Sequence, residues 1–176
     1  LPPDTHGAHV LTFAIFLPIA AAAVFALLPR RLRSQVETGP AEADPWASRL
    51  RLIASVIGVV PLVILLAAWA RFDGGGGFEL IESSEWIPTL GVGYRVGVDG
   101  LSLPLALMTA VVFAVAIAYP VDLRGRPGPY YALMLFLEGV SVGLFLSLDL
   151  FLFFVFWDLS LVGMYFLIGA WGHGDS

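Results

Sequence analysis

Two acidic residues stand inside long apolar stretches of this chain of 176 residues: Glu138 and Asp158. A charged group at the centre of a membrane helix costs about 2.5–3.5 kcal/mol to insert, whereas each Leu, Ile, Phe or Val offsets only about 0.3–0.6 kcal/mol. A carboxyl group retained at such a depth is a candidate for binding and releasing protons. Burial penalises its charged form and a nearby cation favours that form, so a moving positive charge can switch its protonation.

The spacing of the two acids predicts that they lie at one depth. Glu138 is ten residues before Leu148, and Asp158 is ten residues after it. The turn around Leu148 is short enough to require an antiparallel helix pair. At 1.5 Å per residue, both carboxyl groups lie about 15 Å from this turn, which is half of a hydrocarbon core about 30 Å thick. We expect both acids to face the protein interior and to serve proton translocation.

The alternative role for such an acid is structural. A buried carboxyl group can simply bond a neighbouring helix and hold the bundle together. Two acids at matched depth make this alternative less favourable than it would be for one. All nine basic residues of the chain are Arg, and none lies inside a predicted span, so a cation that tunes the acids would come from outside these 176 residues.

The composition predicts the elements that must position these acids. The chain is 59% hydrophobic and 13% charged, whereas a soluble domain keeps about 25% of its residues charged. We therefore predict an all-α fold, a polytopic transmembrane helix bundle that forms a single membrane domain over residues 1–176. The five predicted spans are 10–28, 52–70, 101–119, 131–147 and 150–171.

Arginine placement predicts the orientation, because positively charged loops stay in the cytoplasm. Seven of the nine arginines flank the first and third connections, and the second connection holds the other two among several acids. The N-terminus is then outside, the 71–98 loop is extracytoplasmic, and the C-terminal end is cytoplasmic, in an inner or plasma cell membrane. The aromatic and turn-forming residues of 79–98 predict a folded loop on the membrane surface. The arginines of the first and third connections are Arg30, Arg31, Arg33, Arg49, Arg51, Arg124 and Arg126.

Other chemistry has little support in the sequence. The chain has no Cys, so it offers no thiolate for an iron–sulfur cluster. His6 and His9 have a chelating spacing but precede the first span without a clear third ligand, and Asp99 and Asp149 are predicted to cap helices. We therefore predict no catalytic residue, no cofactor-binding residue and no metal site in this chain, and no nucleic acid partner.

Three segments have a more specific pattern. Trp-Ile-Pro-Thr-Leu-Gly at 86–91 is followed by Gly-Val-Asp-Gly-Leu-Ser-Leu-Pro-Leu at 97–105, and Phe-Val-Phe-Trp-Asp at 154–158 lies in the run 148–172. Together with 130–138, these segments resemble the third, fifth and fourth helices of the antiporter-like subunit M of bacterial respiratory complex I, the NADH:quinone oxidoreductase. The resemblance covers about half the chain, from 86 to 172, and identifies it as the N-terminal five-helix portion of such a subunit.

The resemblance implies a proton-translocating subunit that performs no redox step, with flavin and iron–sulfur clusters in partner subunits. Its partners would be the lipid bilayer and other membrane-arm subunits, including sister antiporter-like subunits. The family's fifth-helix acid, which pairs with a lysine on a later helix, matches Asp158, and its fourth-helix acid matches Glu138. The family usually has Glu where this chain has Asp158, and Pro where this chain has Gly163.

Several alternatives stay open at this point. The chain could be a subunit of a cation/proton antiporter or of a membrane-bound hydrogenase-type complex, or a structural membrane subunit that conducts nothing. Family subunits carry many more helices, so we expect a fragment of a longer subunit, a split gene product or a reduced relative. The type of quinone, and whether protons or sodium ions move, are also undetermined by the sequence.

Overall fold

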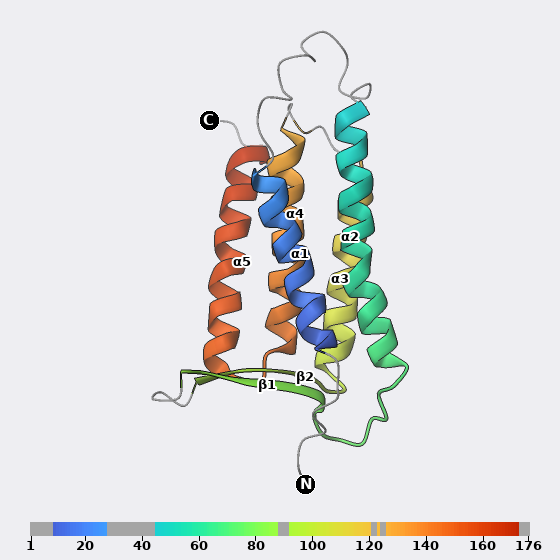
Figure 1. Ribbon diagram of the computed structural model, residues 1–176, viewed down its shortest axis with the longest axis vertical. Coiled ribbons are helices and arrows are strands. Elements are labelled where there is room, and N and C mark those ends of the chain that lie inside the picture. The colour runs from blue at the N-terminus through green and yellow to red at the C-terminus, as the bar shows by residue number, and fades with distance from the viewer. Residues whose placement is uncertain (1–8, 28–44, 88–91, 121–122, 124–125, 173–176) are drawn as a thin grey trace.

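The computed structural model describes residues 9–27, 45–87, 92–120, 123 and 126–172. Within these residues the chain forms five helices and one antiparallel pair of strands, and Figure 1 shows how they are arranged. Four of the described helices are long and apolar enough to cross a membrane, and the other is a shorter apolar helix of 17 residues. The predicted polytopic helix bundle is confirmed. The elements are α1 (Val10–Leu27), α2 (Pro45–Trp69), β1 (Glu79–Ile87), β2 (Val92–Val98), α3 (Ser102–Ala118), α4 (Pro127–Leu146) and α5 (Leu150–Trp171).

Two helices begin earlier than the sequence predicted. The start of α2 is Pro45 instead of 52, and the start of α4 is Pro127 instead of 131. Proline favours the first helical turn, because its fixed φ suits the helix and its missing N–H would have no partner there. Hydropathy does not detect these turns because they are less apolar. Arg49 and Arg51 consequently lie on α2 itself, whereas the predicted loop residues Arg30, Arg31, Arg33 and Arg124 lie outside the described residues.

The central helix of the bundle is α4. It contacts α1, α2, α3 and α5, and 67% of its span is buried, compared with 17% for α5. The helices run alternately up and down the long axis, so that α1, α3 and α5 all start at the end where the strands lie (Figure 1). Residues on α4 are therefore shielded from the surroundings on several sides, and residues on α5 are shielded mainly on one.

Glycines let neighbouring helices approach α4 closely, as small residues do in membrane bundles. A Cβ added at Gly139 would lie 2.4 Å from the carbonyl oxygen of Ile15 on α1. About one turn further along α4, a Cβ added at Gly143 would lie 2.7 Å from the Phe156 ring of α5. Gly163, the position where the resemblance expects Pro, packs against Leu137, and α5 runs without interruption through it.

The predicted folded loop is a β-hairpin that crosses one end of the bundle (Figure 1). The Glu82 carboxylate of β1 accepts hydrogen bonds from the backbone N–H groups of Leu11 (2.8 Å) and Thr12 (3.0 Å), at the start of α1. At the turn between α4 and α5, the N–H of Leu148 donates to the carbonyl of Arg95 on β2 over 2.9 Å. The hairpin therefore fixes the ends of α1, α4 and α5 relative to one another.

Candidate functional site

Glu138 lies in the interior of the bundle, at the twelfth of the 20 residues of α4. Its side chain is 0% exposed, and it is the one charged residue that is buried within the described part of the chain. The expectation that this acid faces the interior is confirmed. A carboxyl group so placed is shielded from solvent by α4 and its neighbours, which penalises the carboxylate form unless a cation or several donors accompany it.

The Glu138 carboxyl group is directed toward α2 and α3. A Cβ added at Gly58 of α2 would lie 3.2 Å from Oε2 of Glu138 and 2.9 Å from Cδ1 of Ile117 on α3. Gly58 thus provides the space in which the carboxyl group lies against the α2 backbone. Neither carboxyl oxygen has a hydrogen-bond partner among the residues that the structure describes. Buried polar atoms are nearly always hydrogen-bonded, so this acid requires an explanation beyond packing.

Asp158 lies at the depth of Glu138 but on a different surface. Glu138 is eight residues before the end of α4 at Leu146, and Asp158 is eight residues after the start of α5 at Leu150, so each lies about 12 Å from its helix end. The predicted matching of depth agrees with these helix bounds.

The expectation that Asp158 faces the interior is wrong for the bundle that the described residues form. Asp158 is exposed, on the face of α5 that also carries the exposed residues Phe154, Leu161 and Tyr165. The other face of α5, with Phe156 and Gly163, packs on α4. Because α5 is apolar on all sides, its sequence offers no periodic signal for which face is covered. The structure consequently does not bring the two carboxyl groups together.

The two acids predicted to be caps do cap helices. Asp99 Oδ1 accepts from the N–H of Ser102 over 2.6 Å and from that of Leu101 over 3.0 Å, at the start of α3. These donors, led by the Ser102 N–H, lower the pKa of Asp99 below its usual range. Asp149 accepts from the N–H groups of Phe151 and Leu152 at the start of α5.

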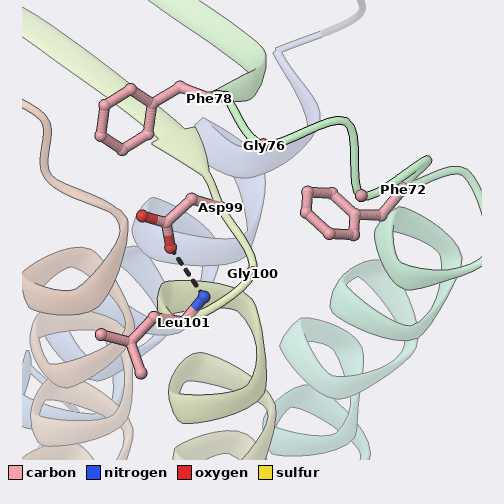
Figure 2. A pocket seen from close by; sticks show the side chains of 8 residues that line it. Phe72, Gly76, Phe78, Asp99, Gly100 and Leu101 are labelled. Carbon is pink, nitrogen blue, oxygen red and sulfur yellow. Dashed lines mark hydrogen bonds between the residues drawn. The ribbon is translucent and has the colours of Figure 1, made fainter.

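A cavity of about 270 Å³ lies at the hairpin end, and Glu138 is not among the residues that line it; Figure 2 shows the lining side chains from close by. The rings of Phe72 and Phe78 and the Asp99 carboxylate border it, together with glycines of the 74–77 run. A glycine-rich loop can cradle phosphate, but here the helix N-terminus is already occupied by the negatively charged Asp99. The cavity therefore offers no phosphate site.

Metal ligation has no support among the described residues, which contain no group of three His, Asp or Glu side chains that could hold an ion. His9 is the single histidine that the structure describes, and His6 lies outside the described residues.

Sequence reasoning missed one residue of the site, Gly58, and one residue that holds the start of α1, Glu82. Gly58 was not singled out, although a glycine in the middle of a spanning helix often marks a close helix contact. Glu82 is one of the acids of the second connection, and its bond to α1 was not predicted because the partner residue, Leu11, is 71 residues away in sequence. The contact of Gly58 with Glu138 and that of Glu82 with α1 can be identified only once the fold is known.

No family model matches the chain. Curated relatives do. The chain is 38% identical over 174 residues to NAD(P)H-quinone oxidoreductase chain 4 2 of Synechococcus sp. (strain JA-2-3B'a(2-13)), covering 97% of this chain and 32% of the relative. It is 35% identical over 164 residues to chain 4 3 of a Picosynechococcus species, covering 92% of this chain and 27% of that relative.

The same oxidoreductase chain of Acaryochloris marina is 34% identical over 172 residues, covering 97% of this chain and 30% of the relative. The chain thus spans about a third of the length of these relatives. The resemblance to an antiporter-like subunit, predicted from the sequence, is confirmed by these names. Over nearly all of its residues, this chain is homologous to part of NAD(P)H-quinone oxidoreductase chain 4.

Proposed function

We propose that this chain forms part of a proton-translocating membrane subunit of an NAD(P)H-quinone oxidoreductase, and that Glu138 binds and releases the translocated proton. The observation that carries the proposal is a fully buried acid, in the middle of a spanning helix, whose carboxyl oxygens have no partner among the described residues. Ionisable residues inside membrane spans mark ion pathways by default.

The same observation separates this function from a purely structural role. An acid kept to hold helices together would bond a neighbouring helix, since an interhelical hydrogen bond contributes about 0.6–2 kcal/mol. Glu138 makes no such bond within the described residues, and it lies against Gly58, which has no side chain to offer one. Glu138 costs free energy to insert into the membrane and gains no interhelical hydrogen bond within the described residues in return. This combination favours a role in proton transfer over a structural one.

Asp158 is proposed to act with a cation that lies outside these residues. Its exposed position on α5 leaves room for another helix to bring a basic side chain against it, as the resemblance implies for a lysine of a later helix. At the same depth as Glu138, it can take part in one lateral proton path through the middle of the membrane. The Asp side chain is one methylene shorter than the usual Glu, so its partner has to approach more closely.

The rest of the complex supplies the redox chemistry in this proposal. Iron–sulfur clusters are assigned to partner subunits because this chain contains no cysteine to hold a cluster, and flavin is assigned to them because the resemblance implies it. Other membrane-arm subunits, including sister antiporter-like subunits, contact the chain within the bilayer. The hairpin and the N-terminal end of the bundle face the outside, and the C-terminal end of α5 faces the cytoplasm.

Membership of the complex is tested by affinity purification of the tagged full-length subunit from its native membranes. We expect subunits with flavin and iron–sulfur clusters to copurify and the preparation to reduce quinone with NAD(P)H. Copurification with other antiporter-like subunits alone, without redox subunits, would contradict the proposal and favour a cation/proton antiporter.

The role of Asp158 is tested by redox-driven proton uptake in membrane vesicles, normalised to the amount of assembled complex. Asp158→Asn removes the exchangeable proton but keeps a similar shape, so most proton translocation should be lost. Asp158→Glu restores the acid that the family usually has at this depth and should retain translocation. Normal uptake by the Asn variant would rule out Asp158 as a proton carrier.

A further inference from the structure

The buried face of α2 has an unusual composition at the level of Glu138. Its residues Ala54, Gly58, Pro61 and Leu65 are all buried and follow one another at helical spacings of four, three and four. Three of these four residues are small or lack a flexible side chain, so the backbone of α2 is close to α4 here. The Glu138 carboxyl group, fully buried and without a partner among the described residues, is aimed at this stretch.

Pro61 changes the hydrogen bonding of that backbone. Proline has no N–H, so the carbonyl of Ile57, four residues earlier, lacks its usual helical donor. A helical carbonyl points toward the residue four places on, and Pro61 is buried, so the Ile57 carbonyl is on the inner side of α2. The bundle interior therefore holds a backbone acceptor without its usual donor and an acid whose oxygens lack partners.

The Glu138 carboxyl group lies against Gly58, the residue that follows Ile57 in the chain. Oε2 of Glu138 lies 3.2 Å from the position of a Cβ on Gly58. A Cα–Cβ bond is about 1.5 Å long, so Oε2 is within about 4.7 Å of the Gly58 Cα, next to which the Ile57 carbonyl stands in the chain. A rotation of the Glu138 side chain is enough to change which part of this backbone its carboxyl group meets.

We infer that the Ile57 carbonyl is the acceptor that holds the Glu138 carboxyl group when it carries a proton. A protonated carboxyl group has one O–H donor, and the freed carbonyl has a lone pair to receive it. When the proton leaves, the donor is lost and the carboxylate oxygens are no longer attracted to the carbonyl. Gly58 and Pro61 are accordingly positioning residues: Pro61 frees the acceptor and Gly58 lets the acid reach it. This inference rests on the proposed function and adds the site at which the proton is held.

The chain contains a matched control. Pro18 of α1 is also buried in mid-helix, and it likewise removes the helical donor for the carbonyl of Ala14. Pro18 packs against Gly139, at 3.0 Å from the position of its Cβ, whereas Glu138 is directed toward α2. Replacing Pro18 with Ala thus restores an equivalent helical hydrogen bond in α1, whereas the carboxyl group faces α2.

The first test uses infrared difference spectroscopy and proton-to-electron ratios on the assembled complex. The carboxyl C=O band of protonated Glu138 is identified by its loss in Glu138→Gln. Pro61→Ala supplies an N–H that competes for the Ile57 carbonyl, so we expect the band to shift to higher frequency and the ratio to fall. Pro18→Ala should change neither. An unshifted band and an unchanged ratio in Pro61→Ala would overturn the inference.

A second variant approaches the same contact from the other side. Gly58→Ala combined with Ile117→Val adds a methyl group facing Oε2 while removing the Cδ1 atom that would otherwise clash with it. We expect the same band shift and fall in ratio, and neither in Ile117→Val alone. Suppose that Glu138→Gln abolishes translocation, but that neither Pro61→Ala nor the double variant Gly58→Ala with Ile117→Val shifts the carboxyl band. The inference then fails and the proposed function stands. If Glu138→Gln translocates normally, the proposed function itself fails.

Discussion

Replacing Gly139 with Ala tests whether α1 and α4 pack as closely as the structure shows. The new Cβ would lie 2.4 Å from the Ile15 carbonyl oxygen and 2.7 Å from Cγ1 of Ile19. An ordinary contact begins near 3.4 Å, so the two helices must separate by about 1.0 Å, the difference between 3.4 and 2.4. The contacted oxygen belongs to the backbone and cannot rotate away.

The magnitude follows from two opposing effects. Overpacking a tight contact costs about 1–3 kcal/mol, and a backbone contact belongs at the upper end of that range. Ala in place of Gly stabilises a helix by about 1 kcal/mol. We therefore expect the Gly139→Ala variant to lose about 2 kcal/mol of unfolding free energy. The control is Gly169→Ala on α5, where nothing lies within 4 Å of the added Cβ, and which should gain up to about 1 kcal/mol.

The assay is denaturant unfolding of the purified full-length subunit in detergent, with both variants measured beside the unsubstituted protein. Gly139→Ala should be less stable than wild type and Gly169→Ala more stable. Their unfolding free energies should differ from each other by about 3 kcal/mol. A Gly139→Ala variant as stable as Gly169→Ala would refute the close packing of α1 on α4, and with it the position assigned to the neighbouring Glu138.

Three further outcomes are expected. Glu82→Ala removes the acceptor at the start of α1, so hydrogen exchange at the Leu11 and Thr12 amides should accelerate, and stability should fall by about 0.5–2 kcal/mol as for a lost cap; unchanged exchange would contradict the contact. The Ser102 N–H lowers the pKa of Asp99 in the folded protein below the unfolded pKa of 3.8. The Asp99 carboxylate therefore stabilises the fold above pH 3.8, and this stabilisation is lost as the pH falls through the lowered pKa. Thermal unfolding of Asp99→Asn should therefore approach that of wild type only in acid, and a constant difference would refute this. The purified polypeptide, separated from its partners, should show no flavin, haem or cluster absorbance, whereas a stoichiometric chromophore would contradict the prediction that this chain performs no redox step.

The helices and the depth of the acids could be predicted from the sequence because both depend on local properties. Apolar length identified the spans, and the short turn near Leu148 fixed the matched depths of Glu138 and Asp158. The first turns of α2 and α4 were missed, since hydropathy does not register a helix start made by proline and polar residues.

The orientation of the acids could not be predicted, because it depends on which faces other helices cover. The helices α4 and α5 are apolar around their whole circumference, so no periodicity distinguishes a buried face from an exposed one. Glu138 is enclosed because α4 is central, and Asp158 is exposed because α5 packs on one side only. The contact of Glu82 with α1 joins residues about 70 positions apart and has no local signature.

The most direct measurement is the number of protons translocated per electron by vesicles that contain the purified complex, with Glu138 intact or replaced by Gln. Glu138→Gln keeps the side-chain volume but removes the titratable group, so the complex should assemble and reduce quinone. We expect the proton-to-electron ratio to fall by the share that the proposed function assigns to this subunit. A ratio equal to that of wild type, in a fully assembled complex, would contradict the proposal that Glu138 is the proton carrier.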